Sequence, residues 1–145
     1  MSYERFTRAL RERSEKRERE FPVFVERLRE STHPSCAILF GSRVRGTASY
    51  MSDYDLLLIT RDKVPEKKLR MWAQDFGVDL FVVHLSDADI LLERAHTVLL
   101  DALMDGRVLY DDIGVVDQLK KKSLRVTNEL GIHRTTYGWM PRYTN

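Results

Sequence analysis

The segment "GSRVRGTASYMSDYDLLLI", from Gly41 to Ile59, places two aspartates directly before an apolar run. We expect a β-strand over residues 53–60, and side chains two apart on a strand point to the same face. Asp53 and Asp55 would therefore lie side by side, within reach of one ion. Two adjacent carboxylates repel each other unless a cation holds them together. Hard oxygen ligands suit Mg²⁺ or Mn²⁺, so the pair predicts a metal site.

A third carboxylate, Asp79, lies in "GVDLFVVHL" (77–85), an apolar segment that is typical of a further strand. If this strand neighbours residues 53–60, Asp79 joins the first two carboxylates at one end of a sheet. Asp75 and Asp87 compete for this role, but Asp75 falls near a helix end and Asp87 fits a helix cap. We therefore expect Asp79 to complete the metal site.

The Gly-Ser turn supplies the other half of the predicted site. We expect a buried strand over 36–40, followed by Gly41 and by a short helix that begins near Ser42. Backbone N–H groups at such a turn can bind an anion, and glycine lets a phosphate approach the main chain closely. The Ser42 hydroxyl adds a hydrogen-bond donor, and Arg43 or Arg45 can neutralise the charge of a triphosphate. A phosphate-binding loop beside a metal site indicates a metal–nucleotide substrate.

These residues also carry a family resemblance. Gly41 and Ser42, followed by ten residues and "DYD", resemble the Gly-Ser-x10-Asp-x-Asp signature of the DNA polymerase β-like nucleotidyltransferase superfamily. The fuller segment closely resembles the minimal nucleotidyltransferase (MNT) family, over roughly residues 34–110. Val44 departs from the pattern, because many relatives carry alanine there. The resemblance implies the polymerase β-like fold, an α/β (α+β) architecture with a mixed sheet flanked by helices.

The resemblance further implies roles for individual residues. Asp53 and Asp55 would ligate two metal ions, Mg²⁺ or Mn²⁺, and Asp79 would ligate the catalytic ion and help to deprotonate the attacking hydroxyl. Gly41 and Ser42 would bind the β- and γ-phosphates of the nucleotide. The implied reaction is attack of an acceptor hydroxyl on the α-phosphate of a nucleoside triphosphate, with release of pyrophosphate. ATP, as donor of AMP, is the expected substrate.

The acceptor is expected to be another macromolecule, because the chain has little length left for an acceptor domain. Within the resembled family, many members pair with a HEPN-domain toxin and silence it, some by adenylylating a tyrosine. The resemblance therefore implies a HEPN-type toxin as partner and an antitoxin role. Two other hypotheses stay open. One is a non-catalytic nucleotide-binding or toxin-docking protein, and the other is a small-molecule transferase of the aminoglycoside-modifying kind.

The composition is that of a soluble globular protein. The chain has 145 residues, 43% hydrophobic and 32% charged, with a formal net charge of +2. This small charge does not indicate a protein that coats nucleic acid, and no apolar stretch is long enough to span a membrane. The single cysteine, Cys36, excludes an intrachain disulfide and a multi-cysteine zinc site. No secretory signal pattern is present at the N-terminus, so the expected location is the cytoplasm.

The remaining segments predict helices around the sheet. Residues 4–20 alternate glutamate and arginine, which favours an exposed helix, and Pro22 is expected to begin a second one. Such mixed charge is typical of a solvated surface, with an arm that contacts a partner chain or RNA as the alternative. Strands that alternate with helices indicate an α/β or α+β domain. The further expected elements are a helix over 64–76, a long helix over 86–106 with Ser86 or Asp87 as N-cap, an edge strand over 107–112 and a helix over 113–130.

We expect one compact domain with three parts. These are an N-terminal charged helical segment (1–33), the nucleotidyltransferase core (34–111), and a C-terminal helix with an aromatic and basic tail (112–145). The tail from residue 131 shows no clear period. It is compatible with covering a nucleotide, binding an acceptor, forming a homo-oligomer contact or packing against the sheet.

Overall fold

The computed structural model describes residues 2–49 and 52–142. Its centre is a four-stranded mixed sheet in the order β3-β2-β1-β4, as expected for a polymerase β-like nucleotidyltransferase fold. β1 pairs antiparallel with β2 and with β4, whereas β3 runs parallel to β2. The strands are β1 (Ser35–Phe40), β2 (Tyr54–Thr60), β3 (Val78–His84) and β4 (Arg107–Asp111). β3 and β4 are the two edges, so the predicted edge strand over 107–112 is confirmed.

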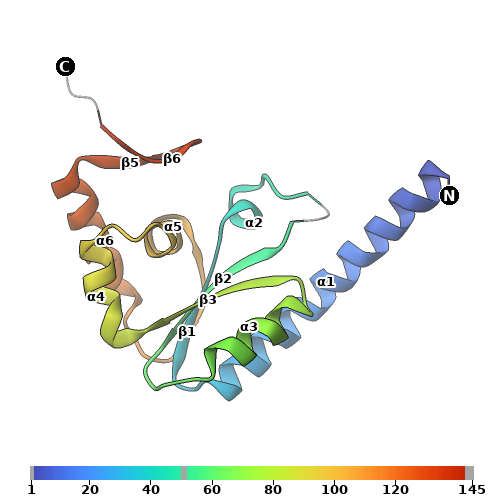
Figure 1. The fold of residues 1–145 in the computed structure, drawn as a ribbon, viewed down its shortest axis with the longest axis horizontal. Helices are drawn as coiled ribbons and strands as arrows, with labels where there is room; N and C mark the ends of the chain where they lie inside the picture. Colours follow the sequence, from blue (N-terminus) through green and yellow to red (C-terminus); the bar gives the residue numbers. More distant parts are fainter. Residues whose placement is uncertain (1, 50–51, 143–145) are drawn as a thin grey trace.

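Helices cover both faces of the sheet (Figure 1). Leu57 and Ile59 of β2 point to one face, while Leu56 and Leu58 point to the other, as the alternation of a strand requires. The first face packs against α4 (Leu85–Glu93), α5 (Thr97–Asp105) and α6 (Val116–Leu130). The second face packs against α1 (Tyr3–Ser31) and α3 (Glu66–Gln74). The layered core places the ends of the strands at the surface.

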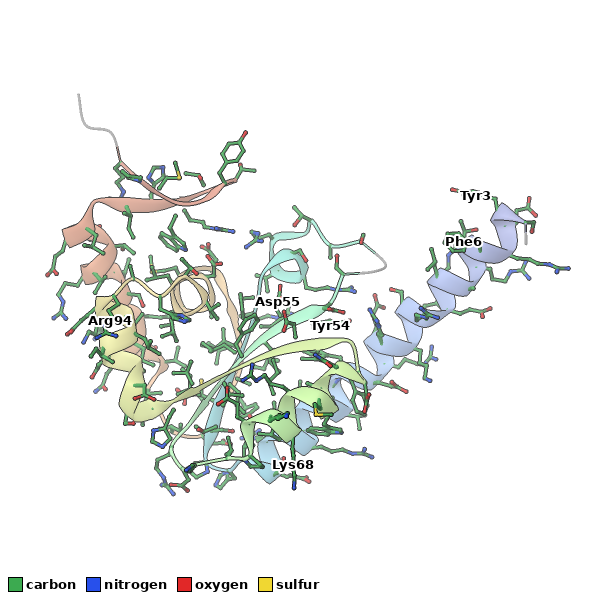
Figure 2. The ribbon with its side chains drawn as sticks, viewed as in Figure 1. Tyr3, Phe6, Tyr54, Asp55, Lys68 and Arg94 are labelled. Carbon is green, nitrogen blue, oxygen red and sulfur yellow. The ribbon has the colours of Figure 1, made fainter. Side chains whose placement is uncertain are left out.

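The N-terminal segment is one helix, so the prediction of a second helix beginning at Pro22 is wrong. α1 runs without a break from Tyr3 to Ser31, with Pro22 inside it. Phe21, Phe24 and Leu28 are buried against the sheet on both sides of the proline, and this packing outweighs the backbone hydrogen bond that proline cannot make. The N-terminal half of α1 extends away from the sheet and carries exposed side chains (Figure 2).

The segment over 86–106 forms two helices, so the prediction of one long helix is also wrong. α4 ends near Arg94, and Ala95 adopts a positive φ of 55° before α5 begins. A histidine caps each helix. His84 accepts from the Ser86 N–H, and His96 accepts from the Leu99 N–H. Ser86 and Asp87 therefore lie within the first turn of α4 rather than at its cap.

The tail forms an ordered hairpin of β5 (Ile132–Thr135) and β6 (Gly138–Pro141) that the sequence did not indicate. The hairpin follows α6 and lies on the side of the molecule where the short helix α2 (Ser42–Arg45) is found (Figure 1). Asp101 of α5 anchors it, because Trp139 Nε1 donates to Asp101 Oδ1 at 2.9 Å and Arg134 Nε lies 3.4 Å from the same oxygen. Within the described residues, no helix is both long and apolar enough to cross a membrane.

Candidate active site

Asp55 and Asp79 are direct neighbours across the β2–β3 pair. They are register partners on parallel strands, so their side chains point to the same face, about 4.8 Å apart at the backbone. On its other side Asp55 pairs with Phe40, the last residue of β1. Asp55 is half-buried and Asp79 is exposed. The sheet thus presents two carboxylates at the end where β1 leads into the Gly-Ser turn.

The charge of Asp55 is poorly compensated. Burial raises the pKa of the Asp55 carboxyl above its ordinary value, and the negative charges of Asp79 and Asp53 raise the pKa further. The positive charge of Arg45 lowers the pKa of Asp55. A carboxylate that is destabilised by two neighbouring carboxylates gains most from a bound cation. The donor set of hard oxygens therefore fits a divalent metal ion such as Mg²⁺.

Asp53 is near this pair but is directed elsewhere. It lies one residue before β2, is exposed, and has its Oδ1 atom 3.7 Å from Nη1 of Arg17 on α1. That Arg17 nitrogen is buried and makes no hydrogen bond to the described part of the chain. With the side chains so oriented, no three histidine, cysteine or acidic residues among 2–49 and 52–142 gather closely enough to hold one metal ion. The structure brings Asp55 and Asp79 together and pairs Asp53 with Arg17.

Gly41 lies directly against the Asp55 carboxylate. Its φ is +80° and its ψ is −153°, a conformation that is nearly restricted to glycine. A Cβ atom at this position would collide with the Asp55 side chain, including its Oδ2 atom. The absence of a side chain is what allows the turn to approach the carboxylate. The phosphate-binding loop and the carboxylate pair that the sequence predicts separately are therefore adjacent in the fold.

The two arginines after Ser42 face different surroundings. Together with Val44 they form the four-residue helix α2 (Ser42–Arg45), in which the N–H groups of Val44 and Arg45 both donate to the Gly41 carbonyl. Arg43 donates to the Ser52 carbonyl at 2.7 Å, and its guanidinium lies 4.4 Å from the Tyr54 ring centre. Arg43 therefore organises the loop that leads to β2. Arg45 is exposed and close enough to influence Asp55.

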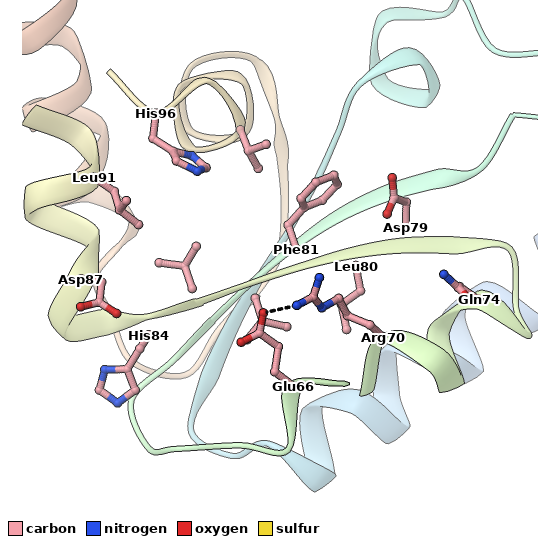
Figure 3. A pocket seen from close by; sticks show the side chains of 13 residues that line it. Glu66, Arg70, Gln74, Asp79, Leu80, Phe81, His84, Asp87, Leu91 and His96 are labelled. Carbon is pink, nitrogen blue, oxygen red and sulfur yellow. Dashed lines mark hydrogen bonds and ion pairs between the residues drawn. The ribbon is translucent and has the colours of Figure 1, made fainter. Parts of the chain in front are cut away.

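Two clefts open beside Asp79. One, of about 410 Å³, runs along β3 from Asp79 to His84, between α3 and the α4–α5 pair (Figure 3). The other, of about 350 Å³, is lined by Asp53, Gly77 and Asp79. Gln74 and Asp79 line both clefts, so the two are neighbours. Neither Gln74 nor Arg17 is predicted from the sequence, because nothing in their local pattern says what they face in the fold.

Comparisons with known proteins identify the family and the fold. The family model "Polymerase beta, Nucleotidyltransferase" matches residues 24–113. A crystal structure of a toxin–antitoxin with AMP-PNP is similar with a TM-score of 0.52 at 20% identity, covering 73% of this chain and 85% of that chain. The tri-AMPylated Shewanella oneidensis HEPN toxin in complex with MNT antitoxin gives 0.50 at 17% identity, covering 81% and 88%. These likenesses show a shared fold. A search of curated proteins finds no match.

Proposed function

The chain belongs to the polymerase beta nucleotidyltransferase family, and we propose that it transfers AMP from ATP to a hydroxyl group of a macromolecular acceptor with Mg²⁺ as cofactor. The observation that carries this proposal is the pairing of Asp55 with Asp79 beside Gly41. A carboxylate pair in which the pKa of Asp55 is raised is costly in a protein that only docks to a partner, but it suits a site that binds a metal–nucleotide complex.

Each side chain of the site has a proposed role. Asp53, Asp55 and Asp79 hold the metal, for which Asp53 turns from Arg17 towards the other two. Gly41 and Ser42 hold the β- and γ-phosphates, with the free N–H groups at the start of α2 facing the ligand and Arg45 opposing the negative charge. When bound, divalent ions neutralise charge on the attacking and leaving oxygens.

The proposed reaction is a single in-line displacement. The acceptor oxygen forms a bond to the α-phosphorus, and the bond from that phosphorus to the bridging oxygen of the β-phosphate breaks. Pyrophosphate leaves with the electron pair, and the acceptor proton passes to the Asp79 carboxylate. Asp79 is suited to this step because it is exposed and lines both clefts, whereas Asp55 is half-buried. The protein mainly positions the reactants and neutralises charge.

We propose a HEPN-type toxin as the acceptor, which would make this chain an antitoxin. Support comes from the solved structures of similar fold. One is a toxin–antitoxin with AMP-PNP, and another is an MNT antitoxin in complex with a tri-AMPylated HEPN toxin. An AMPylated partner is the product expected when AMP is transferred from ATP to a protein hydroxyl.

Label transfer tests the proposal. The protein is incubated with Mg²⁺, its co-encoded partner and ATP labelled at the α-phosphate, and the Asp53→Asn/Asp55→Asn variant is run in parallel. We expect the wild type to label the partner and the variant not to. ATP labelled at the γ-phosphate is the control, and it should leave the partner unlabelled because pyrophosphate departs. Equal labelling by both proteins, or none by either, contradicts the proposal.

A second candidate function is a non-catalytic nucleotide-binding or toxin-docking protein. One observation favours it, namely that Asp53 pairs with Arg17 and the carboxylates are not gathered around one point. On this hypothesis, partner binding is unchanged in the Asp53→Asn/Asp55→Asn variant and no label moves in any arm of the experiment above. The same preparation therefore separates the two candidates.

A further inference from the structure

The β3 strand has a free hydrogen-bonding edge beside the candidate active site. β3 is an edge strand of the sheet, and within the described residues it pairs with β2 alone. The Tyr54 N–H donates to the Gly77 carbonyl at 2.9 Å, which directs the backbone groups of Asp79 and Phe81 towards β2 and those of Leu80 and Val82 outward. Within residues 2–49 and 52–142, no backbone hydrogen bond outside the sheet uses the Leu80 or Val82 groups.

A groove follows this free edge. The cleft of about 410 Å³ has β3 as its floor, Glu66 and Arg70 of α3 on one wall, and Leu91 of α4 with His96 before α5 on the other (Figure 3). The helices flank the edge and cover part of it, since Leu80 is 3% exposed and Val82 is half-buried. From Asp79 to His84 the floor measures about 17 Å at the usual rise of a strand, which matches an extended segment of five or six residues. The groove is thus the size of one added strand.

We propose that this groove binds an extended peptide segment of the acceptor protein as a fifth strand beside β3, with a hydroxyl side chain placed next to Asp79. A strand added at an edge gains main-chain hydrogen bonds from the exposed N–H and C=O groups. The residue opposite Asp79 in such a strand points to the same face as Asp79, with Cβ atoms about 5 Å apart. This register brings a tyrosine, serine or threonine hydroxyl to the carboxylates. The inference rests on the proposed nucleotidyl transfer to a protein.

Continuity and charge favour a peptide over the other occupants of such a groove. Gln74 and Asp79 line both the groove and the cleft that contains Asp53, so a chain lying on β3 would end beside the candidate active site. Glu66 and Asp79 are acidic and lie towards the groove, and Arg70 is already paired with Glu66 at 2.8 Å. A nucleic acid would bring phosphates to these carboxylates and could not match the main-chain ladder.

Peptide binding tests the inference without any need for catalysis. The probe is acetyl-Thr-Val-Tyr-Val-Thr-amide, added to isotope-labelled protein whose amide signals and exchange rates are followed by NMR. We expect the Leu80 and Val82 amides to shift and to exchange at least tenfold more slowly, because they gain acceptors. The Phe81 amide, which already faces β2, should change much less. The same peptide with N-methyl groups at alternate residues cannot form the ladder and should not bind.

A substitution in β3 tests the inference in the label-transfer assay. Val82→Pro removes an outward N–H and leaves the β2 ladder intact, and Val82→Ile is the matched control that keeps the N–H. We expect Val82→Pro to label the partner at least tenfold more slowly while binding Mg²⁺–ATP as the wild type does. Unchanged labelling, equal binding of the N-methylated peptide, or protection of Leu80 and Val82 by Mg²⁺–ATP alone would overturn the inference. Peptide pairing without any label transfer would instead refute the proposed function.

Discussion

Asp55 and Asp79 face each other in register across two parallel strands, so that two carboxylates lie together at one end of the β2–β3 pair. Like charges directly opposite each other destabilise a pair of strands, and here burial adds to the cost by raising the pKa of Asp55. Nothing in the fold requires acidic residues at these positions. Destabilising contacts of this kind are expected at binding sites, where function and not stability determines the residues.

Replacing one of the two carboxylates should therefore stabilise the metal-free protein. We expect Asp55→Asn to raise the free energy of unfolding by roughly 0.5–1 kcal/mol in the presence of a chelator, because it removes the cross-strand repulsion. The same change should lower AMP transfer at least about 100-fold. Asp62→Asn, at an exposed position after β2, is the matched control. Urea unfolding and label transfer measure the two effects, and a destabilised Asp55→Asn protein would contradict this account of the pair.

Gly41 should tolerate no side chain, whereas Gly46 should. Both have a positive φ, of 80° and 76°, but only a Cβ at Gly41 meets the Asp55 carboxylate. We expect Gly41→Ala to cost about 1–3 kcal/mol of stability and to abolish transfer, because the turn and the carboxylate must separate. Gly46→Ala should cost roughly 1 kcal/mol for the left-handed backbone alone and keep its transfer rate. Equal transfer rates in the two variants would show that the close approach at Gly41 is unimportant.

Arg17 should compete with metal for Asp53. The guanidinium lies 3.7 Å from the Asp53 carboxylate, and a partly exposed pair of this kind contributes at most about 1 kcal/mol. We expect Arg17→Met to lower the Mg²⁺ concentration needed for half-maximal transfer by about two- to fivefold. Arg13→Met, one turn earlier at an exposed position, should leave it unchanged. A higher Mg²⁺ requirement in Arg17→Met would mean that Arg17 positions Asp53 for the metal.

The ion pair that joins the end of α1 to the segment after β4 should make stability depend on pH in the acid range. Asp112 accepts two hydrogen bonds from Arg29, at 2.9 and 2.6 Å, and these bonds hold the pKa of Asp112 below its ordinary value. Because the folded pKa is lowered, the stabilisation is present above the pKa of an unfolded aspartate, about 3.9. It is lost as the pH falls through the lower folded value.

The corresponding measurement compares thermal unfolding of the wild type and Asp112→Asn from neutral pH downward. We expect the variant to unfold at a lower temperature at neutral pH, and the difference to shrink below about pH 4 and vanish in strong acid. Asp111 is unsuitable as a control because it caps the following turn through three backbone N–H groups. Asp62→Asn serves instead. A difference that persists unchanged into acid would refute the role of the pair.

The sequence predicted the parts of the site that depend on local pattern. The period of a strand is two residues, so spacing alone places Asp55 on the face of Leu57 and Ile59, and Gly41 indicates a turn. The shared face expected for Asp53 and Asp55 is not seen, because Asp53 lies before β2 and its carboxylate faces Arg17. Predicting that Asp55 and Asp79 are adjacent requires the order of the strands in the sheet, and residue spacing does not give that order. The contact of Arg17 with Asp53 could not be predicted, because it depends on where α1 packs across the sheet.

The errors in the fold have a common cause. The helix start at Pro22 and the single helix through Ala95 are predictions from local signals. In the structure, tertiary packing determines where these helices begin and end. Phe21 and Phe24 are buried on either side of the proline and keep α1 continuous, and a residue with positive φ ends the first helix where no glycine or proline marks the break. The β5–β6 hairpin was missed because Trp139 and Arg134 gain their anchor from Asp101, a residue distant in the sequence.

The central claim is that Asp53, Asp55 and Asp79 together bind divalent metal opposite the Gly-Ser turn. Its most direct test is a crystal structure with Mn²⁺ and a non-hydrolysable ATP analogue, in which anomalous scattering locates the metal. The account predicts a manganese peak coordinated by the carboxylates of Asp53, Asp55 and Asp79, with Asp53 released from Arg17 and the phosphates against Gly41. A manganese peak coordinated by other residues would contradict the account. So would a bound nucleotide with no metal at these carboxylates.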